Sequence, residues 1–352
     1  MNKKKVMVLF GGPTMEYYAA CKAVGNAIDY IDTEKYDVIK VGITQDGKWF
    51  LTNASSTEIR DGDAWMARDD NRSASLLPER GTHKLLILNN DNTYENIDID
   101  VAFPIIAGYG GEDGRLQGLF DLADIPYVGS GLFSSAACMD KEITAVFSDL
   151  CNLRRPEFTI VHKKDFHKDF DCSKAIPFGY PAFVKPARGG TSVGVARVEN
   201  DNEFISAMED SFKYDDKNII EEEIRGDEIK VAVLGNDNLQ YGAICKLTVK
   251  PGTINSYEAK QEGYTHKEMP AKLPKALEDE IFKNTEKIYK KLGCKGLARV
   301  DFFTNEKGEL YFNEINTMPG LGISSLYSRM FEAAGWDFSD LLSQLIETAF
   351  TK

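Results

Sequence analysis

Two apolar-rich segments near the C-terminal end of the chain, residues 297–304 and 309–320, are separated by the turn-forming residues 305–308. Short apolar segments on either side of a polar, glycine-containing turn predict a β-hairpin. Successive side chains of a strand point to opposite faces of the sheet, so every second residue shares a face. The hairpin therefore fixes which of its polar side chains can meet, and it constrains the fold more than any other segment.

Four polar side chains interrupt the apolar pattern of this hairpin. The period of two puts Arg299 and Asp301 on one face of the first strand, and it puts Glu314 and Asn316 on one face of the second. Two carboxylates and an amide suit Mg²⁺, which keeps some waters and is usually completed by substrate phosphates. A single acidic residue is most often a solvated surface group, but these strands are otherwise apolar. We interpret Asp301, Glu314 and Asn316 as candidate metal ligands in a protein that uses a phosphate donor.

Length and charge limit the kinds of partner that suit this chain. Its 352 residues exceed what one hydrophobic core usually fills, so two or three domains are expected. The net charge is −13, from 42 Lys and Arg against 55 Asp and Glu, and no dense basic block occurs. This balance disfavours binding to nucleic acid or to an anionic membrane. No apolar run approaches the ~18 residues of a membrane helix, and we expect a small-molecule ligand.

Cysteines and histidines are few and scattered. The six cysteines form no C-x-x-C motif, and the N-terminus runs directly into a predicted strand without a secretory segment. We therefore expect a cytoplasmic protein. The four histidines give no support for a catalytic triad or an H-E-x-x-H zinc site.

The N-terminal third has the pattern of a doubly wound α/β domain. An apolar run at residues 6–10 ends in two glycines and precedes a predicted helix at 16–30 and a strand at 37–43. Another buried strand is predicted at 98–106, before a glycine-dense loop at 107–114. The first glycines lack the G-x-G-x-x-G spacing of a dinucleotide site, so NAD binding is not expected.

Two further regions follow. At residues 183–195 a strand leads into a loop with glycines and hydroxyls and then into another strand. The backbone N–H groups of such a loop can hold a polyphosphate, although the Walker A sequence is missing. A strand is predicted at residues 240–248. Residues 250–270 form a long polar segment without periodicity, which we interpret as a lid. We predict domains at residues 1–128, 129–221 and 222–352.

A series of short motifs resembles, in family order, the D-alanine–D-alanine ligase family of ATP-grasp enzymes. The motifs are Gly11-Gly12…Glu16, Gly111-Glu112-Asp113-Gly114…Leu116-Gln117-Gly118, Ile125-Pro126-Tyr127-Val128-Gly129-Ser130, Met139-Asp140-Lys141, Val184-Lys185-Pro186, Ser192-Val193-Gly194, Glu258-Ala259-Lys260, Arg299-Val300-Asp301 and Asn313-Glu314-Ile315-Asn316-Thr317-Met318-Pro319-Gly320. Each motif alone is weak, but the set spans nearly the whole chain. The resemblance implies an α/β ATP-grasp fold with an N-terminal doubly wound, Rossmann-like domain.

The resemblance also implies roles for individual residues. The positions that match ATP contacts are Lys141 and Lys185 at the phosphates, Ser192 in the glycine-rich loop over them, Glu221, Glu222 and Ile224 on the strand that contacts adenine, and Glu228 at the ribose hydroxyls. The positions that match ligands of two Mg²⁺ ions, for which Mn²⁺ can substitute, are Asp301, Glu314 and Asn316. The positions that match the chemistry are Arg299 and the Gly320 N–H at the oxyanion, Lys260 beside the transferred phosphate, Thr191 in place of the serine before Ser192, Ser325 at the acceptor carboxylate, and Glu16 at the amino group of the first substrate.

Departures from the family pattern gather at the amino-acid positions. Tyr17 and Tyr18 follow Glu16 where the family has His-Glu, Ala107 stands in place of a histidine, and Gln261 in place of a tyrosine. The polar stretch after Pro-Gly is replaced by Leu-Gly-Ile-Ser-Ser. We expect the ATP and metal sites to be kept, and these substitutions to alter the site of one or both amino acids.

The resemblance predicts an ATP-dependent ligase that joins two amino acids through an acyl phosphate, most simply D-alanine to D-alanine for peptidoglycan precursors. One alternative is a ligase that joins D-alanine or another first amino acid to a different acceptor. Another is a catalytically reduced, ATP-binding regulatory protein, against which the kept metal positions, Arg299 and both lysines argue. A biotin-type carboxylase is disfavoured because the lid and terminal helices match the dipeptide ligases. A homodimer is expected at family level.

Overall fold

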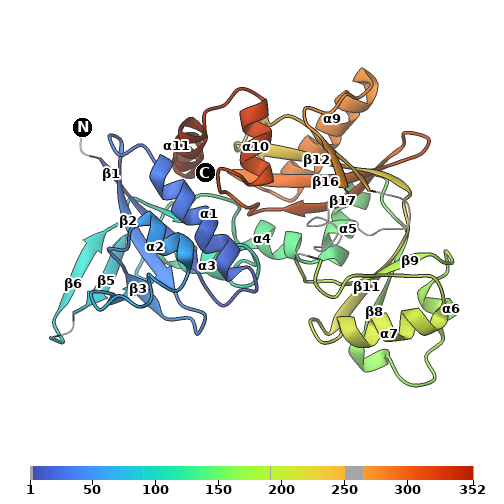
Figure 1. Ribbon diagram of the computed structural model, residues 1–352, viewed down its shortest axis with the longest axis horizontal. Coiled ribbons are helices and arrows are strands. Elements are labelled where there is room, and N and C mark those ends of the chain that lie inside the picture. Colours follow the sequence, from blue (N-terminus) through green and yellow to red (C-terminus); the bar gives the residue numbers. More distant parts are fainter. Residues whose placement is uncertain (1–2, 90, 191, 250–264, 352) are drawn as a thin grey trace.

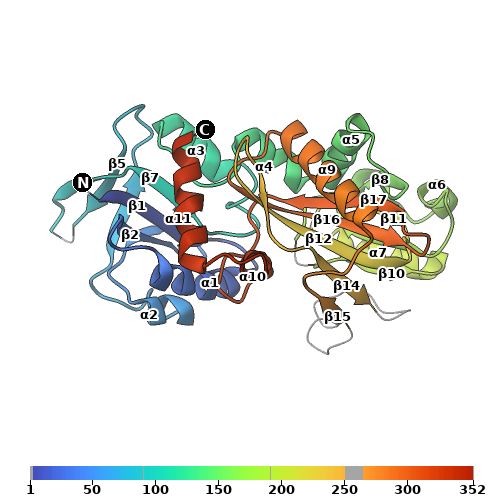
Figure 2. The ribbon, with the colours of Figure 1, turned by 90° about the horizontal axis from the view of Figure 1, so that it is seen from above.

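The computed structural model describes residues 3–89, 91–190, 192–249 and 265–351 (Figure 1). Three β-sheets follow one another along the chain, with seven, four and six strands. Figures 1 and 2 show the first sheet at one end of an elongated molecule and the other two sheets toward the opposite end. In these ranges no helix has the length and apolar character needed to cross a membrane.

The seven-stranded sheet has the order β6-β5-β4-β3-β2-β1-β7. Strands β2, β1 and β7 are parallel, whereas β3 to β6 continue the sheet as an antiparallel extension at its edge. The parallel centre agrees with the doubly wound pattern, because parallel strands need crossover helices. The strands are β1 (Lys4–Gly11), β2 (Tyr36–Ile43), β3 (Trp49–Leu51), β4 (Arg72–Leu76), β5 (Lys84–Leu88), β6 (Tyr94–Asp98) and β7 (Val101–Pro104).

Helices cover both faces of this sheet, which explains why residues 6–10 of β1 are all apolar. They are α1 (Tyr17–Tyr30), α2 (Ser56–Asp61), α3 (Arg115–Ala123) and, from the end of the chain, α11 (Phe338–Thr348). Val8 and Phe10 belong to a buried cluster with α1 and α11. Met7 and Leu9 belong to a second cluster, with α3. A strand buried on both faces has no polar side, so its sequence does not alternate.

The four-stranded sheet is antiparallel and has the order β10-β9-β11-β8. Figure 1 shows it in green and yellow, set apart from the N-terminal sheet. Its elements are β8 (Phe158–His162), a 3-10 turn (Lys163–Asp165), α6 (Cys172–Ala175), β9 (Ala182–Pro186), β10 (Ala196–Val198), α7 (Asp201–Ser211) and β11 (Lys217–Glu222). Phe204 and Met208 of α7 pack against this sheet in one buried cluster. The glycine-rich loop predicted at residues 183–195 is the β9–β10 connection.

The six-stranded sheet carries the predicted hairpin at its edge, in the order β15-β14-β12-β16-β17, with β13 paired to β12. Its strands are β12 (Gly226–Leu234), β13 (Gln240–Tyr241), β14 (Cys245–Val249), β15 (Thr265–Glu268), β16 (Leu297–Asn305) and β17 (Leu310–Asn316). The helices around it are α4 (Leu132–Met139), α5 (Lys141–Leu150), α9 (Lys275–Lys291) and α10 (Leu326–Ala333). Ile281 and Ile288 of α9 pack on one face of the sheet, and α10 packs on the other.

Three predicted segments differ from the structure. The strand predicted at 98–106 is shorter, because β6 ends at Asp98 and β7 begins at Val101. The strand predicted at 240–248 is interrupted, because Gly242 approaches the backbone of Met330 too closely for a side chain and the Ala243 N–H donates to the Met330 carbonyl. Within the segment predicted as a lid, residues 265–268 form β15, and residues 250–264 lie outside the described ranges. The domain boundaries stay a prediction.

Candidate active site

A cavity of about 910 Å³ lies where segments from all three sheets meet. The N-terminal sheet contributes Glu16 and the loop at 107–112, and the β9–β10 loop contributes its glycines. Further charged lining comes from the strands β9 to β12, β16 and β17 and from the beginning of α5. The cavity therefore combines segments that are far apart in the sequence.

Most of the predicted site residues line this cavity. They are Glu16, Lys141, Lys185, Ser192, Glu221, Glu222, Ile224, Glu228, Arg299, Glu314, Asn316 and Gly320. Asp301 is buried behind Arg299, and Ser325 lies at the start of α10; neither lines the cavity. Thr191 and Lys260 lie outside the described residues, as does Gln261. The structure brings the predicted set to one place, and the roles of its members stay proposals.

The hairpin pairs its two strands so that the polar residues predicted to share a face in each strand lie opposite one another. Asp301 of β16 lies opposite Glu314 of β17, and Arg299 lies opposite Asn316. The Gly308 N–H closes the turn on the carbonyl of Asn305 at 2.8 Å. The register shifts just after Asp301, where the ladder has a bulge. Such a bulge turns the following side chains relative to the partner strand, and it sits next to the polar cluster.

Asp301 is held by two cations. Its side chain is 1% exposed; Oδ1 accepts from Arg299 Nε at 2.7 Å, and Oδ2 accepts from Lys230 Nζ at 2.7 Å. Burial alone would raise the pKa of Asp301, but Arg299 and Lys230 outweigh burial and lower it to about 2. The sequence analysis did not identify Lys230. Its only signal is its place opposite Asp301 in the β12–β16 ladder, which becomes visible once the strands are paired.

The donor set at the hairpin fits a hard cation chemically. Glu314 lies in the cavity, with its carboxylate 3.9 Å from the Arg299 guanidinium. The Asn316 carbonyl oxygen accepts the Met318 N–H at 2.9 Å. Two carboxylates and an amide supply only oxygen ligands, which are those of Mg²⁺. In the described ranges no cluster of three or more His, Cys, Asp or Glu residues could hold a metal, so the set depends on the amide of Asn316.

Two lysines hold the glycine-rich loop and the adjoining strand. Lys141 Nζ donates to the Gly189 carbonyl at 2.8 Å. Lys185 forms an ion pair with Glu221, which lines the same cavity. Burial alone would lower the pKa of Lys185, but the charge of Glu221 outweighs it and raises the pKa. Both side chains therefore present positive charge at the wall where phosphates were predicted.

Two carboxyl groups of the cavity, those of Glu16 and Glu112, come from the N-terminal third of the chain. Burial raises the pKa of Glu16, and Arg299 partly offsets this effect. Burial and the nearby charges of Glu16 and Glu314 raise the pKa of Glu112 to about 8, although its Oε1 accepts the Gly108 N–H at 3.0 Å. The sequence analysis gave Glu112 no role. Its signal was its place inside a glycine-dense loop, where polar residues face a ligand more often than elsewhere.

Ser325 and Gly320 lie close together at the end of the hairpin. Ser325 is the N-cap residue of α10, and its Oγ accepts the Gly322 N–H at 2.9 Å. A side chain at Gly320 would meet this Oγ at 3.3 Å. The Ser325 hydroxyl therefore stabilises the turn before α10.

Two family models match the chain. The model of the D-ala D-ala ligase N-terminus matches residues 5–130, and the model of the D-ala D-ala ligase C-terminus matches residues 148–347. The chain belongs to the D-alanine–D-alanine ligase family. It therefore has the ATP-grasp fold, and the family is one of ATP-dependent ligases.

Relatives of this family match the chain over its full length. A D-alanine–D-alanine ligase of Caldicellulosiruptor bescii is 39% identical, with 100% of this chain and 96% of the relative covered. The vancomycin B-type resistance protein VanB of Enterococcus faecalis is also 39% identical, with 100% of both chains covered. The solved VanG D-Ala:D-Ser ligase from Enterococcus faecalis has a TM-score of 0.86 and 32% identity, covering 99% of this chain and 100% of that one.

The structure corrects one expectation about the departures from the D-alanine–D-alanine ligase pattern. Tyr17 and Tyr18 were expected among the substituted groups of the amino-acid site, but neither lines the cavity. The Tyr17 hydroxyl donates to the Gly62 carbonyl at 3.0 Å and accepts from Trp65 Nε1 at 2.9 Å. The reason is that α1 begins at Tyr17 and turns both side chains toward the loop after α2. Ala107, in contrast, does line the cavity.

Proposed function

We propose that this chain is an ATP-dependent ligase that joins two amino acids, with D-alanine and D-alanine as the principal pair, for peptidoglycan precursor synthesis. The observation that carries this proposal is the set of charged groups that share one cavity. Lys141, Lys185 and Arg299 supply cations, and Glu16 and Glu112, from the N-terminal third of the chain, supply carboxyl groups. An anionic phosphate donor and an ammonium group are complementary to these two kinds of group.

The proposed reaction has two steps. The γ-phosphoryl group of ATP passes to a carboxylate oxygen of the first amino acid, and ADP leaves. The amine of the second amino acid then attacks the acyl carbon, loses a proton, and expels phosphate through a tetrahedral intermediate. A protein nucleophile is not needed, which agrees with six buried, free cysteines and four scattered histidines.

Residues around the cavity have complementary tasks in these steps. Lys141 and Lys185 would bind phosphate oxygens, and Ser192 would close the loop over them. Arg299 and the Gly320 N–H would stabilise the oxyanion, since fixed donors in a site that excludes water are effective there. Mg²⁺ bound by Asp301, Glu314 and Asn316 would neutralise phosphate charge. In this assignment, Arg299 and Lys230, which pair with Asp301, also orient its carboxylate.

The nucleotide would lie along β11 and β12. The backbone at Glu221, Glu222 and Ile224 would contact adenine, and Glu228 would contact the ribose. Glu16 would bind the ammonium group of the first amino acid. Ala107 adds space beside it, so a larger first amino acid is compatible with this cavity.

A second candidate is a ligase with a different acceptor. The observation that favours it is the similarity in fold to the VanG D-Ala:D-Ser ligase over 99% of the chain. We further propose that the protein is a homodimer, with a mass of twice 39.3 kDa, and that it acts in the cytoplasm, where ATP is available.

The test is phosphate release with ATP and Mg²⁺ over a panel of paired D- and L-amino acids. D-alanine alone should release phosphate and yield D-Ala–D-Ala. Faster release with D-alanine plus D-serine would favour the second candidate. A chain that binds ATP but releases no phosphate with any pair would refute both.

A further inference from the structure

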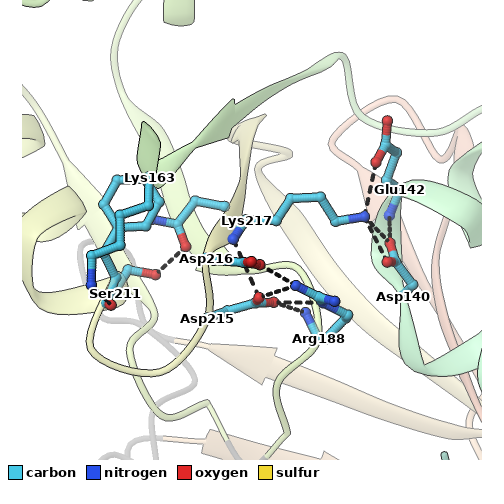
Figure 3. A network of polar contacts seen from close by, with 10 residues as sticks. Asp140, Glu142, Lys163, Arg188, Ser211, Asp215, Asp216 and Lys217 are labelled. Atoms are coloured by element: carbon cyan, nitrogen blue, oxygen red, sulfur yellow. Dashed lines mark hydrogen bonds and ion pairs between the residues drawn. The ribbon is translucent and has the colours of Figure 1, made fainter. Parts of the chain in front are cut away.

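A group of charged side chains lies at the junction of α5, the β9–β10 loop and β11 (Figure 3). We name it the charged clamp. Its members are Asp140, Glu142, Arg188, Asp215, Asp216 and Lys217. Members of the clamp do not line the cavity in the described part of the chain. They touch residues that do, so any influence on ligand binding must pass through those neighbours.

Lys217 is the centre of one half of the clamp. Its side chain reaches across from β11, with Nζ 2.8 and 2.6 Å from the two carboxylate oxygens of Asp140 and 2.9 Å from Glu142 Oε2. The residue is only 8% exposed. Burial alone would lower its pKa, but the hydrogen bonds with Asp140 and Glu142 outweigh burial and raise it. Figure 3 shows the extended side chain ending between the two carboxylates.

Asp140 has a second task, because it is also the N-cap residue of α5. Its Oδ1 accepts the backbone N–H groups of Glu142 and Ile143 at 3.1 and 3.4 Å. Lys141, the next residue, is the first of the helix and lines the cavity. The ion pair with Lys217 therefore holds the helix end from which Lys141 projects.

Three hydrogen bonds close a ring around this ion pair. The Lys141 N–H donates to the Ala187 carbonyl at 3.0 Å, and the Ala187 N–H donates to the Lys217 carbonyl at 2.9 Å. Lys141 Nζ reaches the Gly189 carbonyl two residues further along the same loop. The helix end, the glycine-rich loop and β11 are thus joined by backbone and side chain together.

Arg188 forms the other half of the clamp from within the loop. Its backbone N–H donates to Asp215 Oδ2 at 2.7 Å, and its guanidinium donates to Asp215 Oδ1 at 2.6 Å. It also pairs with Asp216. The Lys217 N–H donates to Asp215 Oδ1 at 3.2 Å, so the two halves share the turn before β11.

The position of the clamp relates the loop to the hairpin on the far side of the cavity. Helix α5 packs against β17 and α9 of the six-stranded sheet. The clamp fixes the glycine-rich loop of the four-stranded sheet to the beginning of the same helix. The separation between the loop and the Glu314 side of the cavity therefore depends on how firmly this junction is held.

We propose that Lys217 and Asp140 are positioning residues that hold Lys141 and the β9–β10 loop in the geometry that binds the phosphates of ATP. This inference rests on the proposed function. It adds to that function a pair of residues outside the cavity that set nucleotide affinity and leave the amino-acid site unaffected.

The first test is Lys217→Met in the full chain. Dissociation constants for AMP-PNP with Mg²⁺ are measured by calorimetry, and KM values for ATP and for D-alanine are measured by phosphate release. We expect both nucleotide constants to rise about tenfold, while KM for D-alanine and kcat stay within about twofold. Lys217→Arg, which keeps the charge, should restore nucleotide affinity to within about threefold of wild type.

Asp140→Asn provides the milder variant, because Lys217→Met leaves two carboxylates unpaired and lowers stability. Asparagine is as good an N-cap residue as aspartate, so this change removes the ion pair and keeps the helix cap. Nucleotide affinity should fall about threefold to fivefold. The matched control is Lys213→Met, which removes an exposed ion pair with Asp210 from the same sheet region and should leave all constants unchanged.

Unchanged nucleotide affinity in Asp140→Asn and in folded Lys217→Met would overturn the inference. A parallel rise in KM for D-alanine would also overturn it, because that result indicates a general loss of structure. A wild-type chain that fails to bind AMP-PNP would refute the proposed function, and the clamp with it. If AMP-PNP binding weakens only in the clamp variants, and wild type and Lys213→Met have the same affinity, the result supports the inference and the nucleotide binding on which it rests.

Discussion

At the scale of single residues, the two hairpin carboxylates have different surroundings. Asp301 is buried and held by Arg299 and Lys230, whereas Glu314 faces the cavity and lies 3.9 Å from the Arg299 guanidinium. A carboxylate already paired with two cations gains less from a further cation than one that is not. Glu314 should therefore carry most of the electrostatic interaction with a metal and its phosphates.

The first prediction is that Glu314→Gln abolishes turnover and leaves the fold intact. The variant removes one charge at the moment of phosphoryl transfer, so phosphate release should fall by at least ~100-fold. Thermal stability should barely change, because the side chain is exposed to the cavity. Glu332→Gln, at an exposed ion pair with Arg329, is the matched control. Activity within tenfold of wild type would show that Glu314 is not a metal ligand.

The second prediction concerns Glu112, whose pKa is raised by burial and nearby carboxylates to about 8. Between the ordinary value of 4.5 and about 8, the folded chain keeps a proton that the unfolded chain releases. The free energy of unfolding contributed by this group therefore falls as pH rises through that window. As pH rises through this window, the free energy of unfolding of Glu112→Gln should fall less than that of wild type, by on the order of 1–3 kcal/mol. Urea denaturation of the metal-free proteins at several pH values measures this free energy. Identical pH profiles for wild type and Glu112→Gln would contradict the prediction.

At the scale of elements, the beginning of α1 shows how a helix separates adjacent residues. Glu16 precedes the helix and lines the cavity, while Tyr17 is 1% exposed and is turned into the core between β1 and the loop after α2. Its hydroxyl satisfies both the Gly62 carbonyl and Trp65 Nε1. These two adjacent residues therefore have different roles: Glu16 lines the cavity, and Tyr17 packs the helix against the core.

The third prediction follows from this separation. Tyr17→Phe leaves a buried carbonyl and a buried indole N–H without their partner, which should lower the free energy of unfolding by about 1–3 kcal/mol. KM values for D-alanine and ATP should stay unchanged. Tyr94→Phe, at a side chain that is 72% exposed, should affect neither quantity. A raised KM for D-alanine without loss of stability would return Tyr17 to the amino-acid site.

At the scale of the whole molecule, the cavity joins three sheets, none of which supplies a complete site. A ligand that contacts all three binds only the assembled fold, so binding stabilises the fold by mass action. Nucleotide and metal together should have this effect, because Lys185 lies on the four-stranded sheet and Glu314 on the six-stranded sheet.

The fourth prediction is that AMP-PNP with Mg²⁺ raises the thermal midpoint, and that above the dissociation constant the gain in stability grows with the logarithm of the ligand concentration. At one hundred times the dissociation constant the gain should be about 2.7 kcal/mol. Chelation of the metal with EDTA should remove most of this gain in stability. The Glu314→Gln variant should show little of the gain. A midpoint that rises equally with and without Mg²⁺ would separate nucleotide binding from the metal site.

The sequence by itself determined the local parts of this protein. The apolar run of β1, the turn at Gly308 and the alternation of β16 and β17 depend on backbone preferences and a period of two, which act between near neighbours. The resemblance in motifs then identified a set of site residues, most of which line the cavity. The boundaries of β7 and the break between β13 and β14 were missed, because distant segments such as α10 set them.

Only the tertiary structure decided which distant groups meet. The pairing of β12 with β16 puts Lys230 beside Asp301, and the arrangement of β11 beside β9 lets Lys217 reach Asp140. The same packing buries Glu112 near Glu16 and turns Tyr17 away from the cavity. Charge interactions and burial depend on distance in space, and sequence spacing does not give that distance until the strands are paired.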